Sequence, residues 1–194
     1  MKAVIFDFDG VLIHSKDSTG NYLWQKNVYA ELGLTDEQMT KIYSGNWFLV
    51  MKGNVCIKQH LKQVFAELDI SLSVDKFIDY WHKNDLMVNK EIIPVIKSIQ
   101  GPQIYIGTNQ DKLRADLIWN RFNQYFDGIF SSHEIGAIKP EIEFFRYIEA
   151  VLEATAEEIV FIDDSKSHVV AAATCGWKCH HYHDIVGLTQ FLSR

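Results

Sequence analysis

The chain has 194 residues, of which 47% are hydrophobic, and a formal net charge of −6. This length suffices for one well-buried domain or a core with a modest insertion. The acidic balance, without a basic run, argues against a nucleic-acid or anionic-membrane partner, and no apolar stretch approaches the ~20 residues of a membrane span. The three cysteines and the lack of a signal-peptide pattern predict a cytoplasmic protein with reduced thiols.

The first predicted strand ends in an acidic turn. Residues 4–6 are an apolar run of β-formers, followed by Asp7, Phe8, Asp9 and Gly10. Because side chains alternate along a strand, both aspartates are expected to share one side while Phe8 enters the core. Gly10 lets the backbone approach a ligand closely. These residues fit a binding site at the carboxyl edge of a sheet, or a common Asp-Gly turn.

The next segment, residues 14–88, has a helical pattern and no convincing strand. Thr35 followed by Gln38 predicts a capping box, and apolar residues recur at helical spacing over 57–68 and 74–81. The large aromatic residues of this segment are expected to pack rather than to form a substrate platform: Trp24, Trp47 and Trp81.

The rest of the chain alternates between the two kinds of element. Strands are expected at 103–107, 129–131, 158–162 and about 177–182, and helices at 92–99, 112–123, 141–153, 166–175 and 185–193. This alternation is typical of βαβ units with a parallel sheet. The sequence therefore predicts an α/β fold with a three-layer, Rossmann-like core (residues 1–13 and 89–194) and a helical domain (residues 14–88) inserted after the first strand.

Two further strand ends carry residues suited to a phosphate. Thr108 and Asn109 precede a helix, so a hydroxyl, an amide and free N–H groups would meet there, although simple N-capping explains the same residues. Lys139 precedes Pro140, which is expected at the first position of the next helix. Its ammonium could neutralise a phosphate, but a lone lysine is usually a solvated surface group.

The strand at 158–162 ends in Asp163, Asp164 and Ser165. Adjacent acids at the end of a buried strand repel each other unless a cation holds them. Together with Asp7 and Asp9 they would form a four-carboxylate cluster suited to Mg²⁺. Helix capping and compensation of the helix dipole are the alternative explanation.

Taken in order, these Asp-x-Asp-Gly, Thr-Asn, Lys-Pro and Asp-Asp-Ser motifs resemble those of the haloacid dehalogenase superfamily of phosphohydrolases. The resemblance covers the whole chain, and residues 14–88 look like the α-helical cap of one large branch. The closest likeness is to the sugar-phosphatase-like group, and it is carried by Gly53-Asn54-Val55, Asp164-Ser165 and Ala171-Ala172 before Gly176.

The resemblance implies a role for each motif. Asp7 would attack phosphorus to form an aspartyl-phosphate, and Asp9 would serve as general acid and then general base. Mg²⁺ would be held by Asp7, the main chain of Asp9 and Asp164, with Asp163 as a second ligand or an outer-shell acid. Phosphoryl oxygens would be bound by Gly10, Thr108, the Asn109 backbone and Lys139.

The expected function is therefore a Mg²⁺-dependent phosphatase for a small phosphorylated metabolite, with a sugar phosphate as one candidate. Asp9 favours phosphoryl transfer, because the dehalogenases of this superfamily lack an acid at that place. A phosphomutase and a non-catalytic binding protein of the same fold are the alternatives. The sequence leaves open whether the protein is a monomer or a homodimer.

Overall fold

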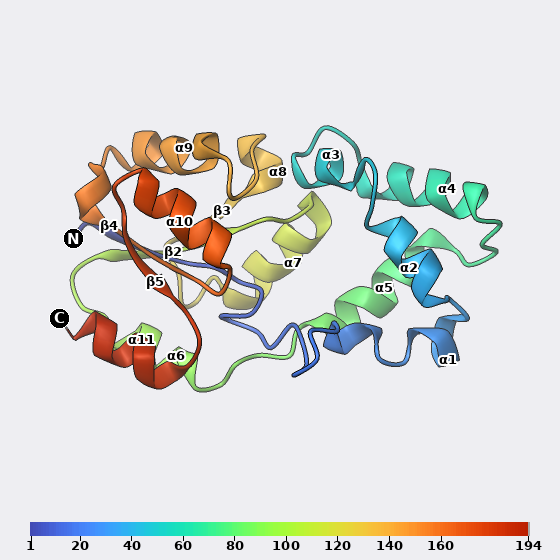
Figure 1. Ribbon diagram of the computed structural model, residues 1–194, viewed down its shortest axis with the longest axis horizontal. Helices are drawn as coiled ribbons and strands as arrows, with labels where there is room; N and C mark the ends of the chain where they lie inside the picture. The colour runs from blue at the N-terminus through green and yellow to red at the C-terminus, as the bar shows by residue number, and fades with distance from the viewer. Residues whose placement is uncertain (194) are drawn as a thin grey trace.

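Five parallel strands form the centre of the computed structural model, which describes residues 1–193 (Figure 1). The sheet order is β3-β2-β1-β4-β5. The strands span Ala3–Phe6 (β1), Gln103–Thr108 (β2), Gly128–Ser131 (β3), Ile159–Asp163 (β4) and Lys178–His181 (β5). β1 is central, because Phe6 is in register with Ile106 of β2 and Ile162 of β4. The chain reverses its direction across the sheet at this strand, which is the topological switch point of an open α/β fold.

Helices cover both faces of the sheet. One face packs on α6 (Ile92–Ser98), α7 (Lys112–Phe122) and α11 (Ile185–Leu192), and the other on α8 (Ser132–Ile135), α9 (Ile142–Leu152) and α10 (Lys166–Thr174). β1 serves both layers by alternation: Val4 and Phe6 enter the first core and Ala3 and Ile5 the second. The predicted three-layer α/β core is confirmed.

A cluster of helices lies between β1 and β2 in the chain and beside the sheet in space (Figure 1). Its elements are a 3₁₀ turn at Leu23–Gln25, α1 (Val28–Leu32), α2 (Asp36–Ile42), α3 (Trp47–Met51), α4 (Ile57–Glu67) and α5 (Val74–Asp85). The predicted capping box of Thr35 and Gln38 opens α2. These helices enclose an apolar core of their own, separate from the two cores of the sheet.

The two ends of this inserted segment leave the sheet side by side. Ile13 and Val88 form an antiparallel bridge, and the His14 N–H donates to the Met87 carbonyl. The chain therefore enters and leaves the helical segment through two neighbouring crossings.

Two local expectations were wrong or missing. Pro140 does not start a helix: α9 begins at Ile142 with Glu141 as its N-cap, and the Lys139–Pro140 peptide bond is cis. The short helix α8 was not predicted, because four residues cannot show a helical period. Within residues 1–193, no helix is both long and apolar enough to cross a membrane.

Candidate active site

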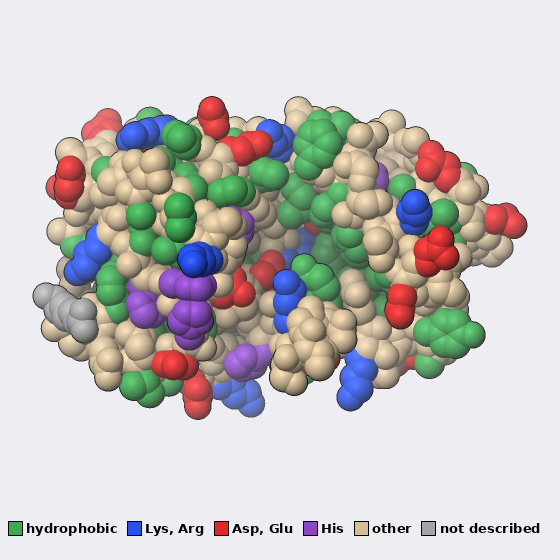
Figure 2. Space-filling view, in the orientation of Figure 1, with side chains coloured by type: hydrophobic (Ala, Val, Ile, Leu, Met, Phe, Trp, Pro, Cys, Tyr) green, Lys and Arg blue, Asp and Glu red, His purple; other side chains and the backbone are tan. Residues whose placement is uncertain are grey.

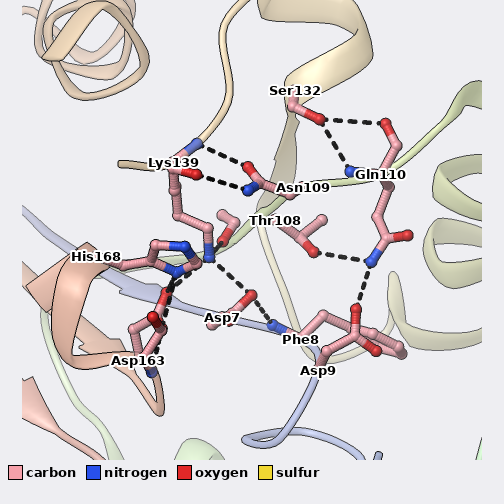
Figure 3. A network of polar contacts seen from close by, with 12 residues as sticks. Asp7, Phe8, Asp9, Thr108, Asn109, Gln110, Ser132, Lys139, Asp163 and His168 are labelled. Carbon is pink, nitrogen blue, oxygen red and sulfur yellow. Dashed lines mark hydrogen bonds and ion pairs between the residues drawn. The ribbon is translucent and has the colours of Figure 1, made fainter. Parts of the chain in front are cut away.

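Lys139 lies at the centre of a buried polar network at the carboxyl end of the sheet (Figure 3). Its ammonium donates to Asp7 Oδ1 (2.8 Å), to Asp163 Oδ2 (2.7 Å) and to the Gly107 carbonyl (2.9 Å). Only 2% of Lys139 is exposed, so the expectation of a solvated surface lysine does not apply. Burial disfavours the charged form, but the Asp163 and Asp7 carboxylates outweigh it and raise the Lys139 pKa. The ammonium is therefore a fixed cation beside Asp7.

The side chain of Asn109 holds Lys139 in place. Its amide donates to the Lys139 carbonyl (2.9 Å), and its oxygen accepts from the Lys139 N–H (2.8 Å). This paired contact ties the end of β2 to the loop before α9 (Figure 3). The sequence assigned Asn109 to phosphate through its backbone and missed this positioning contact.

Asp163 is the second carboxylate bound to Lys139. It is fully buried, accepts from the Ser165 N–H at 2.8 Å, and lies 3.0 Å from Nδ1 of His168. Burial alone would raise the Asp163 pKa, but Lys139 and His168 together lower it. Asp163 therefore remains an ionised partner of Lys139, and its oxygens are already engaged.

Asp9 points toward α7 rather than toward Lys139. Arg114 donates to both of its carboxylate oxygens, at 2.6 and 2.8 Å, and Gln110 Nε2 donates to Oδ2 at 2.6 Å. Burial would raise the Asp9 pKa, but the Arg114 charge and these hydrogen bonds lower it. A bidentate guanidinium pair fixes the plane of a carboxylate as well as its charge.

Arg114 also reaches the inserted helices. The same guanidinium contacts Asp85 at the end of α5, which accepts a further hydrogen bond from the Trp81 indole at 3.1 Å. Arg114 is 4% exposed, so one buried cation joins a carboxylate of the sheet to a carboxylate of the helical segment.

Thr108 and Gly10 complete the floor of the site. The Thr108 hydroxyl is buried and accepts from Gln110 at 3.2 Å. Gly10 has a φ of +81°, and a Cβ there would collide with the Asp164 carboxylate. Glycine at this position thus allows Asp164 to approach the turn that carries Asp7 and Asp9.

The donor set fits a hard divalent cation. Five carboxylates meet two buried cations at this edge: Asp7, Asp9, Asp85, Asp163 and Asp164 against Lys139 and Arg114. Burial raises the Asp7 pKa well above its usual value, against the opposing Lys139 charge. Partial burial and the Asp163 charge raise the Asp164 pKa. Oxygen ligands and excess negative charge suit Mg²⁺.

A second grouping of ligand atoms overlaps the lysine site. One ligand atom each from Asp7, Asp163 and His168 lies within 4.8 Å of the others. Lys139 already contacts both of these carboxylates, so a metal bound by all three residues would face its ammonium.

A cavity of about 1140 Å³ lies between the sheet edge and the inserted helices. Figure 2 shows this hollow, with acidic, basic and hydrophobic side chains at its walls. Six of the eight predicted site residues line it: Asp7, Asp9, Thr108, Asn109, Lys139 and Asp164. Gly10 lies against Asp164 at its edge, and Asp163 lies beneath Lys139.

Four residues of the polar network were not predicted from the sequence: Gln110, Arg114, Asp85 and His168. One signal was present for Arg114: it lies four residues before Ile118 and eight before Phe122, in phase with the buried face of α7. A charged residue in phase with an apolar stripe, near a strand end, indicates a buried ion pair. The same signal was present for Asp85, which lies four residues after Trp81 and eight after Phe77 on the buried face of α5.

These features define an α/β enzyme fold whose polar site lies at the end of the central strand, with an aspartate beside a buried lysine. The haloacid dehalogenase-like hydrolase family matches residues 1–176. The chain belongs to that family.

Relatives and solved structures agree with this assignment. A sesquiterpene phosphatase of Aspergillus oryzae is 25% identical over 187 residues, covering 94% of this chain and 90% of the relative. A predicted HAD-like hydrolase from Porphyromonas gingivalis superposes with a TM-score of 0.81 at 20% identity, covering 100% of this chain and 98% of the other. A HAD-family enzyme of Bacteroides thetaiotaomicron, in complex with magnesium and inorganic phosphate, superposes with a TM-score of 0.79 at 17% identity, covering 97% and 98%.

Proposed function

We propose that the protein is a Mg²⁺-dependent phosphatase that hydrolyses a small phosphorylated metabolite through an aspartyl-phosphate on Asp7. The observation that carries this proposal is the contact of Asp7 with the buried Lys139 ammonium at the wall of the cavity. A phosphate monoester entering the cavity would meet a carboxylate nucleophile and a fixed cation together. The phosphatase relative and the magnesium–phosphate complex of the fold neighbour support the same chemistry.

The residues around Asp7 would bind the transferring group. Lys139 would offset the charge of the phosphoryl oxygens from its fixed position, because its three N–H groups are already taken by Asp7, Asp163 and the Gly107 carbonyl. The Thr108 hydroxyl and the Asn109 backbone would donate to the remaining phosphoryl oxygens. Gly10, which has no side chain, would leave space for them. Asn109 would act as well by holding Lys139.

Asp9 would exchange protons with the leaving oxygen and then with the attacking water. It lines the cavity two residues beyond Asp7. Against the effect of burial, Arg114 and Gln110 lower its pKa and engage both oxygens of its carboxylate, so Asp9 would turn from Arg114 toward the substrate before it exchanges a proton.

Asp7, the main chain of Asp9 and Asp164 would hold the metal. Bound Mg²⁺ would offset the negative charge shared by the Asp7 carboxylate and the phosphate. Asp163 fits the role of an outer-shell acid better than that of a second metal ligand, since its oxygens are engaged by Lys139, His168 and the Ser165 N–H.

We also propose that residues 14–88 act as a cap over a core formed by residues 1–13 and 89–194. The separate apolar core of the inserted helices and the paired crossings at Ile13 and Val88 support this division. The cap would exclude water from the phosphate and contact the organic part of the substrate.

The substrate proposal has two forms. The sequence favours a sugar phosphate, by its likeness to the sugar-phosphatase-like group. The name of the 25% identical relative points to a terpenoid phosphate instead. Both forms keep the same phosphate-binding end of the cavity and differ in what the cap must contact.

The test is phosphate release from a panel of phosphate monoesters, with and without Mg²⁺, by wild type and Asp7→Asn. Release should require both Mg²⁺ and Asp7. The exposed Asp116 on α7 supplies a matched control, since Asp116→Asn removes a carboxylate far from any role proposed for it. Release that survives Asp7→Asn would sink the proposed nucleophile.

The alternatives give different results in the same assay. A phosphomutase would convert a sugar phosphate into its isomer with little free phosphate. A non-catalytic binding protein would be stabilised against heat by a ligand and release no phosphate with millimolar Mg²⁺.

A further inference from the structure

The cap residues that line the cavity differ by depth. Those at the mouth are exposed and, apart from Tyr22, strongly polar: Lys16, Asp17, Asn21, Lys26, Asp36 and Thr40. Those buried or half-buried in the wall are mostly apolar, namely Leu23, Trp24, Met39, Tyr43, Trp47, Met51 and Trp81, and the polar exceptions are Ser15, Gln25 and Asp85. The cavity therefore has a charged phosphate end at the sheet, an apolar wall in the cap and a polar rim.

The apolar wall is a connected aromatic cluster. Tyr43 stands edge-on to Trp47 with ring centres 4.8 Å apart, and to Trp81 at 5.7 Å. Trp24 lies 5.7 Å from Trp81. The expectation that these tryptophans only pack was incomplete, since the same rings face the cavity that contains Asp7. Their mutual packing joins the rings into one continuous aromatic surface.

Few polar groups in this wall are free to bind a substrate hydroxyl. Asp85 is occupied by Arg114 and by the Trp81 indole. The Tyr43 hydroxyl is buried and has no hydrogen-bond partner, and Ser15 and Gln25 are the other polar cap side chains of the wall. A sugar has several hydroxyls, and each one that loses water without a new partner costs free energy.

We propose that the substrate is a monophosphate ester of a mostly hydrocarbon alcohol carrying few polar groups away from the phosphate. This inference rests on the proposed phosphatase function. The phosphate would lie at Asp7 and Lys139, and the hydrocarbon would lie along Trp24, Trp47 and Trp81. The cavity volume, about 1140 Å³, is slightly above the ~300–1,000 Å³ of typical ligand pockets and accommodates an extended chain.

The experiment compares n-decyl phosphate with glucose 6-phosphate, because both are esters of primary alcohols and differ mainly in polarity. The expected kcat/KM with Mg²⁺ is at least about 100-fold higher for decyl phosphate, given that each well-placed methylene is worth roughly tenfold or more. A higher value for glucose 6-phosphate would overturn the inference and leave the phosphatase function standing.

Binding to Asp7→Asn separates this inference from the proposed function. Calorimetry on that variant should show decyl phosphate binding more tightly than glucose 6-phosphate, whether or not the wild type turns either over. Absence of phosphate release from every ester would refute the function, while equal binding of the two esters would refute the apolar substrate.

Trp47→Ala tests the wall itself. Trp47 is half-buried, so its loss should raise the KM for decyl phosphate about tenfold and leave competitive inhibition by inorganic phosphate unchanged. Tyr29 on α1 is 71% exposed and is absent from the cavity lining, so Tyr29→Ala is the matched aromatic control. An unchanged KM in a folded Trp47→Ala protein would contradict the proposal.

Discussion

Replacing Arg114 by methionine should destabilise the folded protein strongly. The guanidinium is 4% exposed and pairs with Asp9 and Asp85. Methionine keeps much of the side-chain volume but leaves both carboxylates without their cation. Removing one partner of a buried ion pair typically costs about 3–5 kcal/mol, and we expect the free energy of unfolding to fall by about that amount.

Urea unfolding followed by circular dichroism measures this change. Lys112→Met is the control on the same helix, because the Lys112–Asp116 pair is exposed and should contribute nothing measurable. Asp85→Asn should reduce the cost of the Arg114 substitution, since one of the two carboxylates is then already neutral. A loss below about 1 kcal/mol for Arg114→Met would refute the view that this cation offsets buried charge.

Three further predictions concern the backbone, pH and thiols. Gly53→Ala should lower the free energy of unfolding by about 2 kcal/mol or more, because Gly53 has a φ of +73° and a Cβ there would collide with the α8 backbone. Gly45 has a φ of +59° with open space around it, so Gly45→Ala should cost only about 1 kcal/mol in the same urea assay. Burial, with help from the Arg114 charge, lowers the His82 pKa to about 4. As the pH falls from 6.5 to 4, the unfolded chain therefore takes up a proton at His82 before the folded protein does, and up to roughly 3 kcal/mol of the free energy of unfolding should be lost. The His82→Gln variant has no such group to protonate and should keep that stability. A thiol reagent should modify the exposed Cys56 rapidly in native protein, and Cys179, whose pKa burial raises to about 12, only on unfolding; equal rates would contradict this.

The sequence predicted the elements with strong local patterns. The apolar run before Asp7 became β1, and the apolar period over 57–68 became α4. Thr35 and Gln38 formed their capping box because both groups lie within one turn. Pro140 misled the prediction, since proline favours a turn as readily as a first helical position and the local sequence does not distinguish the two.

The candidate site was predictable as a location and less so as a network. Strand ends of a parallel sheet share one edge, so Asp7, Thr108 and Asp163 had to converge once the strands were placed. The partner choices were beyond local patterns: Lys139 joins two strands, and Arg114 joins the sheet to a helix 29 residues earlier in the chain, at Asp85. Such pairings depend on tertiary distance, which one sequence does not contain.

The paired crossings at Ile13 and Val88 make the helical segment a replaceable module. Because the two ends of this segment already lie together, the sheet needs only a short connection between them, whatever the length or fold of the inserted segment. Doubling the length of such an excursion adds only about 0.6 kcal/mol of loop-closure cost. An exchanged segment could therefore alter the aromatic wall while the strands, Asp7 and Lys139 stayed as they are, so that new substrate preferences could arise without rebuilding the chemistry.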